Sequence, residues 1–440
     1  MSDKVHLSLR VIAVVGLVTG QQAPVGLLLV GLPAIYLAEG VDLKNLWVMA
    51  FASAPLWFKW AWAPLVDNYG FGRLGRRRSW LIPCTSIAAA GYILLSTIPP
   101  SAESLWPMVL LLMAINVALA TQDIAVDAYT IEAFPAGREA TAAASSTVGY
   151  FLGPLLGSAG LIGLYQAVGW QAALSGAAAV LLLATLPAML LPDPHRTDGN
   201  RPRSLSPIRD AAVTLRAHLS HPVTWLVLGC VFAYAFAWAM PFRMESAYLK
   251  SLGISVGDIG LITGVFSAAG ALAGTFMCER ISARWGLQRA VVLSVLLAVP
   301  GMALYWGFGY MGGYGFAGYA AANLVASILL APMYTAFLGL RFRWASRRHP
   351  GTDFTIQSSV TSLGQSAASA SIALLASSMG WSAFLILCGL LLLGVTGAIC
   401  LGQARLMALL ARRDSERLAA EPAEEAADEL PAGLPERSST

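Results

Sequence analysis

The segment Leu105–Tyr129 reads LWPMVLLLMAINVALATQDIAVDAY and is almost entirely apolar. It is long enough to cross a bilayer as one helix, because a spanning helix needs about 20 mostly apolar residues. Asp123 and Asp127 nevertheless lie within it, one helical turn apart. A charge near the bilayer centre costs about 2.5 to 3.5 kcal/mol on insertion scales, so such residues usually face a bundle interior and mark a transport pathway. The segment therefore predicts a membrane protein with a functional polar stripe.

The rest of the chain has the same character, with 57% hydrophobic and 12% charged residues. Every apolar run of spanning length must be a helix, because lipid offers no hydrogen-bond partner to a free backbone amide. We predict an all-α polytopic membrane protein with twelve transmembrane helices. They are placed at residues 11–37, 44–66, 79–98, 105–129, 140–165, 170–191, 222–249, 257–278, 290–311, 315–340, 352–378 and 381–402.

The basic residues predict the orientation of these helices. Of the 28 Lys and Arg residues, 24 fall in the two termini and in the loops on the same side as the termini. Only Lys44 and Lys250 fall in the opposite loops, and Lys59 and Arg243 lie inside spans. The positive-inside rule then places both termini in the cytoplasm. The net charge of +4 reflects this topology, and we expect no nucleic-acid partner.

The chain divides near its middle. Residues 192–221 are rich in Pro, Arg, Asp and His and carry no long apolar run, which predicts a cytoplasmic linker. It would join an N-terminal six-helix bundle, residues 1–191, to a C-terminal six-helix bundle, residues 222–402. Residues 403–440 form a tail that begins basic and becomes acidic, with the composition of a partly helical or disordered end.

Several classes of function are disfavoured by what the sequence lacks. The five cysteines fall within predicted spans without ligand spacing, so we expect neither a disulfide framework nor a metal site. The five histidines fall in cytoplasmic segments, so a membrane-embedded proton carrier must be a carboxylate. No phosphate-binding loop and no assembled nucleophile, base and acid occur, which argues against an enzyme, a bound cofactor or ATP-driven transport.

An internal repeat supports the two halves. Asp67-NYGFGRLGRR-Arg78 follows the second span, and Glu279-RISARWGLQ-Arg289 follows the eighth. In each copy an acid ends a helix and a Gly/Arg turn leads into the next, so carboxylate and guanidinium groups can pair across the turn. We predict a conformational loop motif that comprises Asp67, Arg73, Gly75, Arg76 and Arg77 in the first copy, with Glu279 and Arg284 in the second. Parallel six-helix repeats suggest two bundles that rock around a site at their interface.

At these residues the chain resembles the major facilitator superfamily, which carries such a loop signature between its second and third helices. Within it, Trp62–Asp67, Gly75–Trp80 and Thr121–Tyr129 resemble the branch of AmpG muropeptide permeases, acetyl-CoA transporters and RhtX/FptX siderophore permeases. The resemblance runs from about residue 20 to 400. It implies two pseudo-symmetric six-helix bundles and secondary transport.

The choice of substrate rests on details within that branch. AmpG-like proteins carry an acid midway along the seventh helix, where this chain has the run Phe236–Met240, and Arg78–Pro83 and Gly351–Gln357 look more like the siderophore permeases. We therefore predict a monomer in the bacterial inner membrane that imports a siderophore from the periplasm with protons. The alternatives are an AmpG-like muropeptide permease and a proton-driven drug exporter, whose Gly-Pro signature Gly149–Ser158 resembles. Helix packing also explains that signature.

Asp123, Asp127 and Lys59 are the predicted coupling or gating residues. Lys59 lies at a depth comparable to that of Asp123, so the two are plausible partners, and Asp127 would then be left to exchange protons. The alternative is a permanent structural pair with one solvated acid.

Other polar residues within or beside spans are candidates for the substrate cavity. Interhelical hydrogen bonds, or snorkelling in the case of Arg243, explain them equally well. These candidates are Gln21, Gln22, Asn116, Gln122, Arg243, Gln357, Thr361 and Gln365.

Overall fold

The computed structural model describes residues 2–70, 74–190, 207–243, 245–310, 315–346 and 349–428, and every regular element in these ranges is a helix. The prediction of an all-α polytopic fold is confirmed. Ten helices in the described ranges are long and apolar enough to cross a membrane.

Several predicted spans of the N-terminal half consist of more than one helical segment. Its elements are α1 (Ser2–Gly26), η1 (Leu27–Gly31), α2 (Leu32–Ala38), η2 (Leu43–Ser53), α3 (Ala54–Phe58), η3 (Lys59–Ala61), α4 (Ala63–Asn68), α5 (Arg78–Leu95), α6 (Leu105–Ala133), α7 (Glu139–Leu155), η5 (Leu156–Gly160), α8 (Leu161–Val168) and α9 (Trp170–Leu190).

The C-terminal half follows a separate helix, α10 (Pro207–Ser220). Its elements are α11 (Pro222–Arg243), α12 (Glu245–Ser251), α13 (Val256–Gly260), η6 (Leu261–Phe266), α14 (Ser267–Trp285), α15 (Leu287–Tyr310), α16 (Gly315–Trp344) and α17 (Pro350–Asp428).

Two of the twelve predicted spans, the second and the eleventh, are not among the ten long helices. The second, Leu43–Asn68, alternates between 3-10 and α-helix because Pro55 and Pro64 cannot donate a backbone hydrogen bond. The eleventh is the first part of α17, and Gly380, with φ of 75°, separates it from the twelfth. Only glycine adopts this left-handed backbone at no steric cost. Gly380 is therefore suited to form the turn between these two spans.

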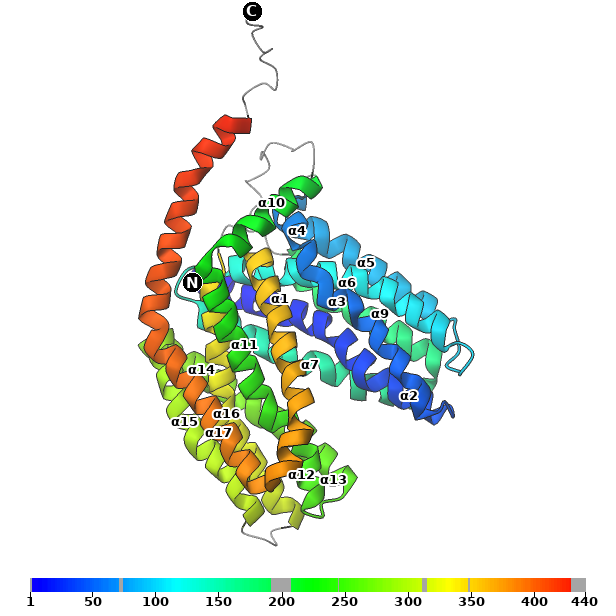
Figure 1. The fold of residues 1–440 in the computed structure, drawn as a ribbon. Helices are drawn as coiled ribbons and strands as arrows, with labels where there is room; N and C mark the ends of the chain where they lie inside the picture. Colours follow the sequence, from blue (N-terminus) through cyan, green and yellow to red (C-terminus); the bar gives the residue numbers. More distant parts are fainter. Residues whose placement is uncertain are drawn as a thin grey trace, which may run out of the picture.

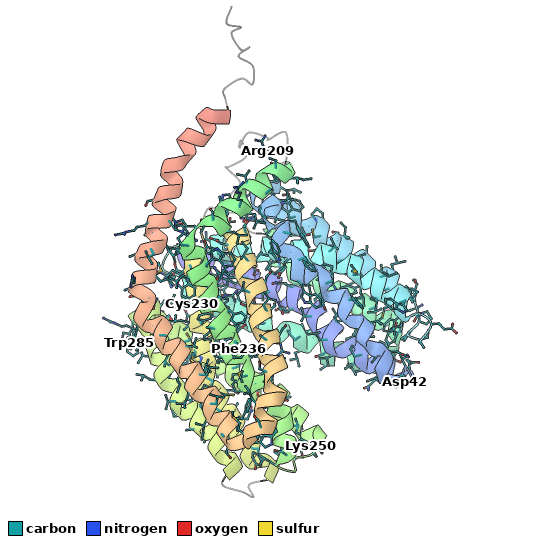
Figure 2. All side chains as sticks on the ribbon, in the orientation of Figure 1. Asp42, Arg209, Cys230, Phe236, Lys250 and Trp285 are labelled. Carbon is teal, nitrogen blue, oxygen red and sulfur yellow. The ribbon has the colours of Figure 1, made fainter. Side chains whose placement is uncertain are left out.

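The two halves converge at one end and diverge toward the other (Figure 1). We call the end that carries α10 the linker end, and α17 ends toward it (Figure 1). Asp42 and Lys250 lie at the opposite, far end of their respective halves, away from Arg209 on α10 (Figure 2). The few basic residues assigned to the outer loops are thus found at the far end.

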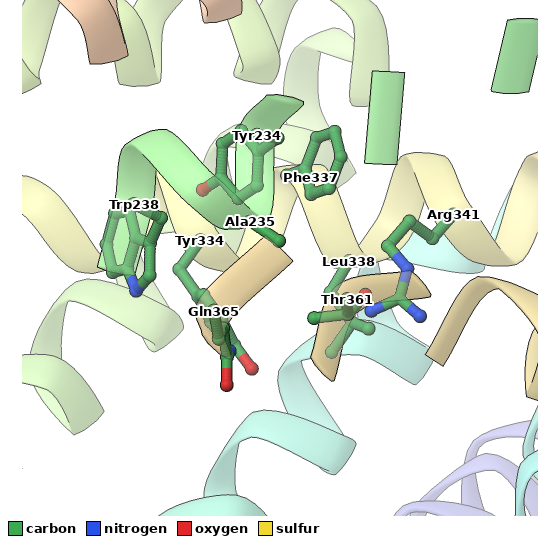
Figure 3. Close-up of a pocket in the computed structure, with 9 residues that line it drawn as sticks. All are labelled: Tyr234, Ala235, Trp238, Tyr334, Phe337, Leu338, Arg341, Thr361 and Gln365. Carbon is green, nitrogen blue, oxygen red and sulfur yellow. The ribbon is translucent and has the colours of Figure 1, made fainter. Parts of the chain in front are cut away.

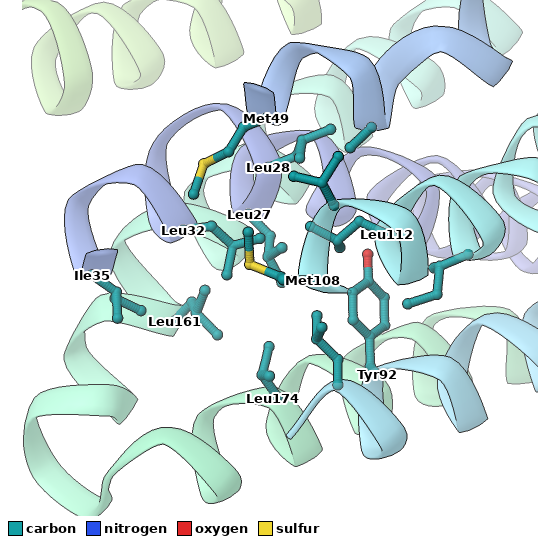
Figure 4. Packing of buried hydrophobic residues seen from close by; sticks show 14 of the residues in the cluster. Leu27, Leu28, Leu32, Ile35, Met49, Tyr92, Met108, Leu112, Leu161 and Leu174 are labelled. Atoms are coloured by element: carbon teal, nitrogen blue, oxygen red, sulfur yellow. The ribbon is translucent and has the colours of Figure 1, made fainter. Parts of the chain in front are cut away.

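Hydrophobic packing follows the same division. The cluster shown in Figure 4, which includes Leu27, Met108 and Leu174, draws on the N-terminal half alone. Two clusters around Met240 and Ile262 draw on the C-terminal half alone. A cluster around Tyr129 combines residues of both halves, with Phe342 and Phe354 contributed by the C-terminal half. The halves therefore share an apolar core where they converge.

Within the N-terminal half, α1 and α7 approach each other closely along a row of glycines. A Cβ on Gly149 would lie 2.6 Å from Val18 Cβ, and one on Gly153 would lie 2.5 Å from Gln22 Cβ. A Cβ on Gly157 would overlap the Ala23 carbonyl oxygen. The packing explanation of the Gly-Pro signature is therefore observed in the structure.

The helix α10 was not expected, because its stretch of the linker carries no long apolar run. Asn68 Nδ2 donates to Thr214 Oγ1 at 3.3 Å, which joins the end of α4 to this helix. His218 is buried and pairs with Asp353, in the first turn of α17, and Arg413 Nη2 lies 3.6 Å from the other oxygen of Asp353. Polar contacts with α4 and with the first turn of α17, one in each half, thus hold α10 at the linker end.

Candidate functional site

The two acids of α6 are both buried, with 4% of Asp123 and 5% of Asp127 exposed. Lys59 forms an ion pair with Asp123, as the sequence predicted. It reaches Asp123 from η3, the 3-10 turn at which the second span changes from α3 to α4. A buried charge is tolerated only when an opposite charge or several hydrogen bonds compensate it. The α6 acid thus supplies the counter-ion that allows Lys59 to lie in an apolar segment.

Asp127 interacts electrostatically with two cations, Lys59 and Arg341, one from each half of the chain. Tyr150 on α7 also interacts electrostatically with Asp127. The four buried charges, Lys59, Asp123, Asp127 and Arg341, balance one another. We call them the charge network.

Arg341 is the member of this network that sequence reasoning missed. The sequence placed it in a basic cytoplasmic loop, but it lies on α16 and is only 8% exposed. Its guanidinium carbon lies 4.5 Å from the centre of the Phe354 ring, and Nη2 donates to Ser358 Oγ at 3.2 Å. Arg343, two residues further along the same helix, is exposed. Helical phase separates the two arginines, and that signal was available in the sequence.

Beside Arg341, the C-terminal half forms a small, partly open pocket, which we call the aromatic pocket (Figure 3). Tyr234 stacks on Phe337 with ring centres 3.6 Å apart, and the centre of the Trp238 ring lies 5.4 Å from that of Tyr334. The pocket is lined by Tyr234, Ala235, Trp238, Tyr334, Phe337, Leu338, Arg341, Thr361 and Gln365. It combines flat apolar walls with one cationic end.

Three predicted cavity residues lie at or beside this pocket. Thr361 and Gln365 line it, and Arg243 Nη2 donates to Gln365 Oε1 at 3.4 Å. Arg243 itself is exposed, so the structure also accommodates the snorkelling interpretation. Thr361 donates back to the Gln357 carbonyl of its own helix at 2.9 Å. Gln357 is buried one turn earlier, and its Oε1 has no hydrogen-bond partner among the described residues.

Two other predicted cavity residues form hydrogen bonds inside the N-terminal half. Asn116 Nδ2 donates to the Ala52 carbonyl at 2.7 Å, and Gln122 Nε2 donates to Thr85 Oγ1 at 2.7 Å. Both side chains are at least nine-tenths buried. They join α6 to neighbouring helices, because a buried amide is costly unless it is bonded. Gln122 Oε1, however, has no hydrogen-bond partner among the described residues.

The glutamines of α1 remain available to a ligand. Gln21 and Gln22 are half-buried, and Gln21 Oε1 has no hydrogen-bond partner in the described part of the chain. Gln22 packs against the Gly153 position of α7. The sequence alone could not distinguish these two amides from Asn116 and Gln122, because all four occur in apolar runs.

The first loop motif forms a compact ionic cluster at the linker end. Arg77 is fully buried, and its Nη2 lies 2.9 Å from Asp67 Oδ1 and 2.5 Å from Glu132 Oε1. Arg76 Nη2 also reaches Glu132, at 3.1 Å. Burial disfavours the charged form of Arg77, but Glu132 and Asp67 outweigh it and raise the pKa of this guanidinium. Gly75 has φ of 92°, the left-handed conformation that the turn requires.

Asp67 also joins the two halves of the molecule. The backbone amides of Gly351 and Thr352 donate to its two oxygens at 3.2 and 2.5 Å, and Thr352 Oγ1 donates at 2.7 Å. These amides lie in the first turn of α17, where free N–H groups and the helix dipole favour an anion. A Cβ on Gly351 would lie 2.8 Å from Asp67 Oδ1, so the close approach depends on glycine.

The second copy of the motif is much weaker. Glu279 Oε1 accepts from Thr141 Oγ1 of α7 at 3.4 Å, and Arg284 is exposed beside Trp285. Among the described residues no ion pair joins Glu279 to Arg284, so the pairing expected for this copy was wrong. Arg73, the remaining residue of the motif, lies outside the described residues.

With the fold and the site described, comparison with known proteins becomes informative. The sequence profile of the Major Facilitator Superfamily matches residues 20–249 and 228–436, which is most of the chain. The chain belongs to this superfamily. Its members are transporters of solutes, in agreement with the absence of enzymatic motifs noted in the sequence.

Sequence relatives point to one branch of the superfamily. The anhydromuropeptide permease of Escherichia coli K12 is 25% identical over 354 residues, which cover 79% of this chain and 70% of the relative. The putative transporter AmpG 4 of Rickettsia conorii is 25% identical over 360 residues, covering 80% and 86%. The AmpG part of the resemblance is thus supported, whereas the siderophore permeases do not figure among these relatives.

Solved structures agree on the fold. The proton:xylose symporter XylE, as double-tryptophan mutants, aligns with a TM-score of 0.64 at 14% identity over 93% of this chain and 99% of that one. The Escherichia coli fucose:proton symporter FucP gives 0.63 at 12% identity over 93% and 98%. At such identities the likeness concerns the fold alone.

Proposed function

We propose that this chain is a proton-driven permease that imports a muropeptide, a sugar joined to a short peptide, across the bacterial inner membrane. The observation that carries the proposal is the charge network, in which the buried Asp127 lies one helical turn from the ion pair of Lys59 with Asp123 and interacts electrostatically with Arg341 of the other half. A carboxylate so placed changes its electrostatic partners whenever the halves move apart. It is therefore suited to couple proton binding to rocking.

The substrate class is supported by the anhydromuropeptide permease of Escherichia coli, which aligns over 79% of this chain and 70% of its own length. The sequence had favoured a siderophore, and this remains the second candidate. It is supported by the run Phe236–Met240, which contributes Trp238 to the aromatic pocket in place of an acid. The drug exporter loses its support, because close packing of α1 and α7 accounts for the Gly-Pro signature.

Orientation completes the proposal. We assign the linker end to the cytoplasm, because α10 lies there and belongs to a segment that the distribution of basic residues predicts to be cytoplasmic. The Asp67 bonds to α17 then close the molecule toward the cytoplasm, and its halves diverge toward the periplasm. Such a state would receive a ligand from the periplasm.

Uptake in proteoliposomes tests both parts of the proposal. With an imposed inward proton gradient, the wild-type protein is expected to accumulate labelled anhydromuropeptide and not a labelled pyochelin-like siderophore. Asp127→Asn is expected to lose gradient-driven accumulation but to keep exchange of labelled for unlabelled substrate, because the amide mimics a permanently protonated acid. Asp414→Asn, whose side chain is 49% exposed, serves as the control.

Two results would contradict the proposal separately. Proton-driven accumulation that survives in Asp127→Asn would exclude this acid as the coupling group. Accumulation of the siderophore alone would exclude a muropeptide as the substrate.

A further inference from the structure

Arg341 is buried without a carboxylate at ion-pair distance in the described part of the chain. Only one hydrogen bond from its side chain is found there, to Ser358 Oγ, and Nε has no hydrogen-bond partner. A guanidinium has five N–H donors in a rigid fork. Several of these donors are therefore unused at a site where an unsatisfied charged group is costly.

The compensation that Arg341 does receive is indirect. The Phe354 ring lies under the guanidinium, and Asp127, Tyr150 and Tyr334 contribute electrostatically. Lys59 offers no alternative for an incoming anion, since it already pairs with Asp123. Arg341 is thus the cation of the charge network with spare hydrogen-bonding capacity.

The aromatic pocket extends from this guanidinium. Figure 3 shows Arg341 beside Thr361 on one side of the pocket, with Trp238 on the other side. Trp238 and Tyr334 line the pocket, are only half-buried and pack against each other, with ring centres 5.4 Å apart. Aromatic faces pack well against the flat or C–H-rich faces of cyclic groups.

From this geometry we infer that the aromatic pocket is an anion-anchoring subsite for a carboxylate that is attached close to a ring. The carboxylate binds the free donors of Arg341 in the paired geometry that guanidinium groups favour. The ring stacks on Trp238 and Tyr334. One available cation suits a singly charged carboxylate better than a doubly charged phosphate.

This inference rests on the proposed function, because it assigns the carboxylate and ring of the transported ligand to the aromatic pocket. The chemistry is shared by two sources: a muropeptide, in which a peptide carboxylate accompanies sugar rings, and a siderophore with a carboxylate beside an aromatic ring. The subsite therefore predicts a preference for the acid form of whichever ligand binds.

Calorimetric titration of the purified full-length protein tests it with four probes. These are an anhydromuropeptide and its amidated form, and pyochelin with its methyl ester. We expect the wild-type protein to bind one acid about 10- to 100-fold more tightly than its neutral form, the range that charged hydrogen bonds supply. Arg341→Gln should remove this preference, and Arg341→Lys should retain part of it. Arg343→Gln, exposed on the same helix, should leave it unchanged.

Trp238→Ala extends the test, because it should weaken the acid and neutral forms equally and leave their ratio intact. It also keeps the test open should Arg341→Gln not fold, which thermal melting would show. Equal wild-type affinity for acid and neutral forms, binding of neither acid, or a preference that persists in Arg341→Gln would overturn the inference. Pyochelin binding with an acid preference would refute only the muropeptide substrate, and muropeptide binding without one would refute only the subsite.

Discussion

At the scale of single residues, the pair of Lys59 and Asp123 joins the second span to the fourth. Both side chains are buried, so each charge depends on the other for its stability. Removing one partner of such a pair leaves an uncompensated charge, which costs about 3 to 5 kcal/mol, whereas removing both is much less harmful.

We therefore expect Lys59→Met and Asp123→Asn each to lower the melting temperature of the purified protein, and the double variant to recover most of the loss. Thermal unfolding in detergent, followed by tryptophan fluorescence, measures this. Lys250→Met, exposed at the far end, is the matched control. A double variant whose loss equals the sum of the two single losses would show that the charges do not stabilise each other.

The sequence predicted the pair of Lys59 and Asp123 from charged residues in apolar runs, but it did not predict the rest of the charge network. Asp123, Asp127 and Lys59 stood out because each is charged inside an apolar run. Arg341 did not, because it borders the basic stretch that contains Arg343, Arg347 and Arg348. Helical phase shows that Arg341 and Arg343 lie on different faces of the helix, and the packing of Arg341 against Phe354 shows which of the two is buried.

At the scale of elements, the contact of α1 with α7 depends on the absence of side chains. At Gly157 an added Cβ would meet the backbone of Ala23, which cannot move aside as a flexible side chain would. Gly163 lies further along the same span, and a Cβ there would meet nothing within 4 Å.

Gly157→Ala is expected to destabilise the protein by about 1 to 3 kcal/mol, the usual cost of overpacking. Gly163→Ala should be neutral or stabilising by about 0.5 to 1 kcal/mol, because alanine favours a helix interior over glycine. Unfolding by denaturant in detergent micelles compares the two variants. Equal free energies of unfolding for the two variants would show that α1 and α7 can move apart without loss of stability.

Elements with strong apolar runs were predicted from the sequence, and those held by polar contacts were not. The run Leu105–Tyr129 lies within α6 as expected. By contrast, α10 is placed by Asn68 and by the buried pair of His218 with Asp353, which join residues far apart in sequence. Prolines in the second span signal the breaks in that helix, but not that one break presents Lys59 to Asp123.

At the scale of the whole molecule, Asp67 is a point of polar bonding between the halves. It accepts three hydrogen bonds from Gly351 and Thr352 of the other half. Hydrogen bonds to a charged group contribute about 1.5 to 3 kcal/mol each. Since about 1.4 kcal/mol changes an equilibrium tenfold, weakening them should change the balance of conformations.

Asp67→Asn is therefore expected to increase the population in which the linker end is open. Spin labels at Arg138→Cys and Arg284→Cys, two exposed positions on opposite halves, report this by pulsed electron resonance after the five native cysteines are replaced. We expect a longer distance component in the variant and none in an Asp42→Asn control. An unchanged distance distribution would show that other contacts keep this end closed.

The two halves and the repeated loop motif were evident from the sequence, but the inequality of the two copies was not. Asp67 and Arg77 form a buried ionic cluster, whereas Glu279 has one long bond to Thr141. At the linker end, polar bonds therefore hold α4 against α17, whereas α7 and α14 are joined by one long hydrogen bond among the described residues. Substitutions in the first copy of the motif should therefore increase the population in which the linker end is open. Equivalent substitutions in the second copy should change that population little.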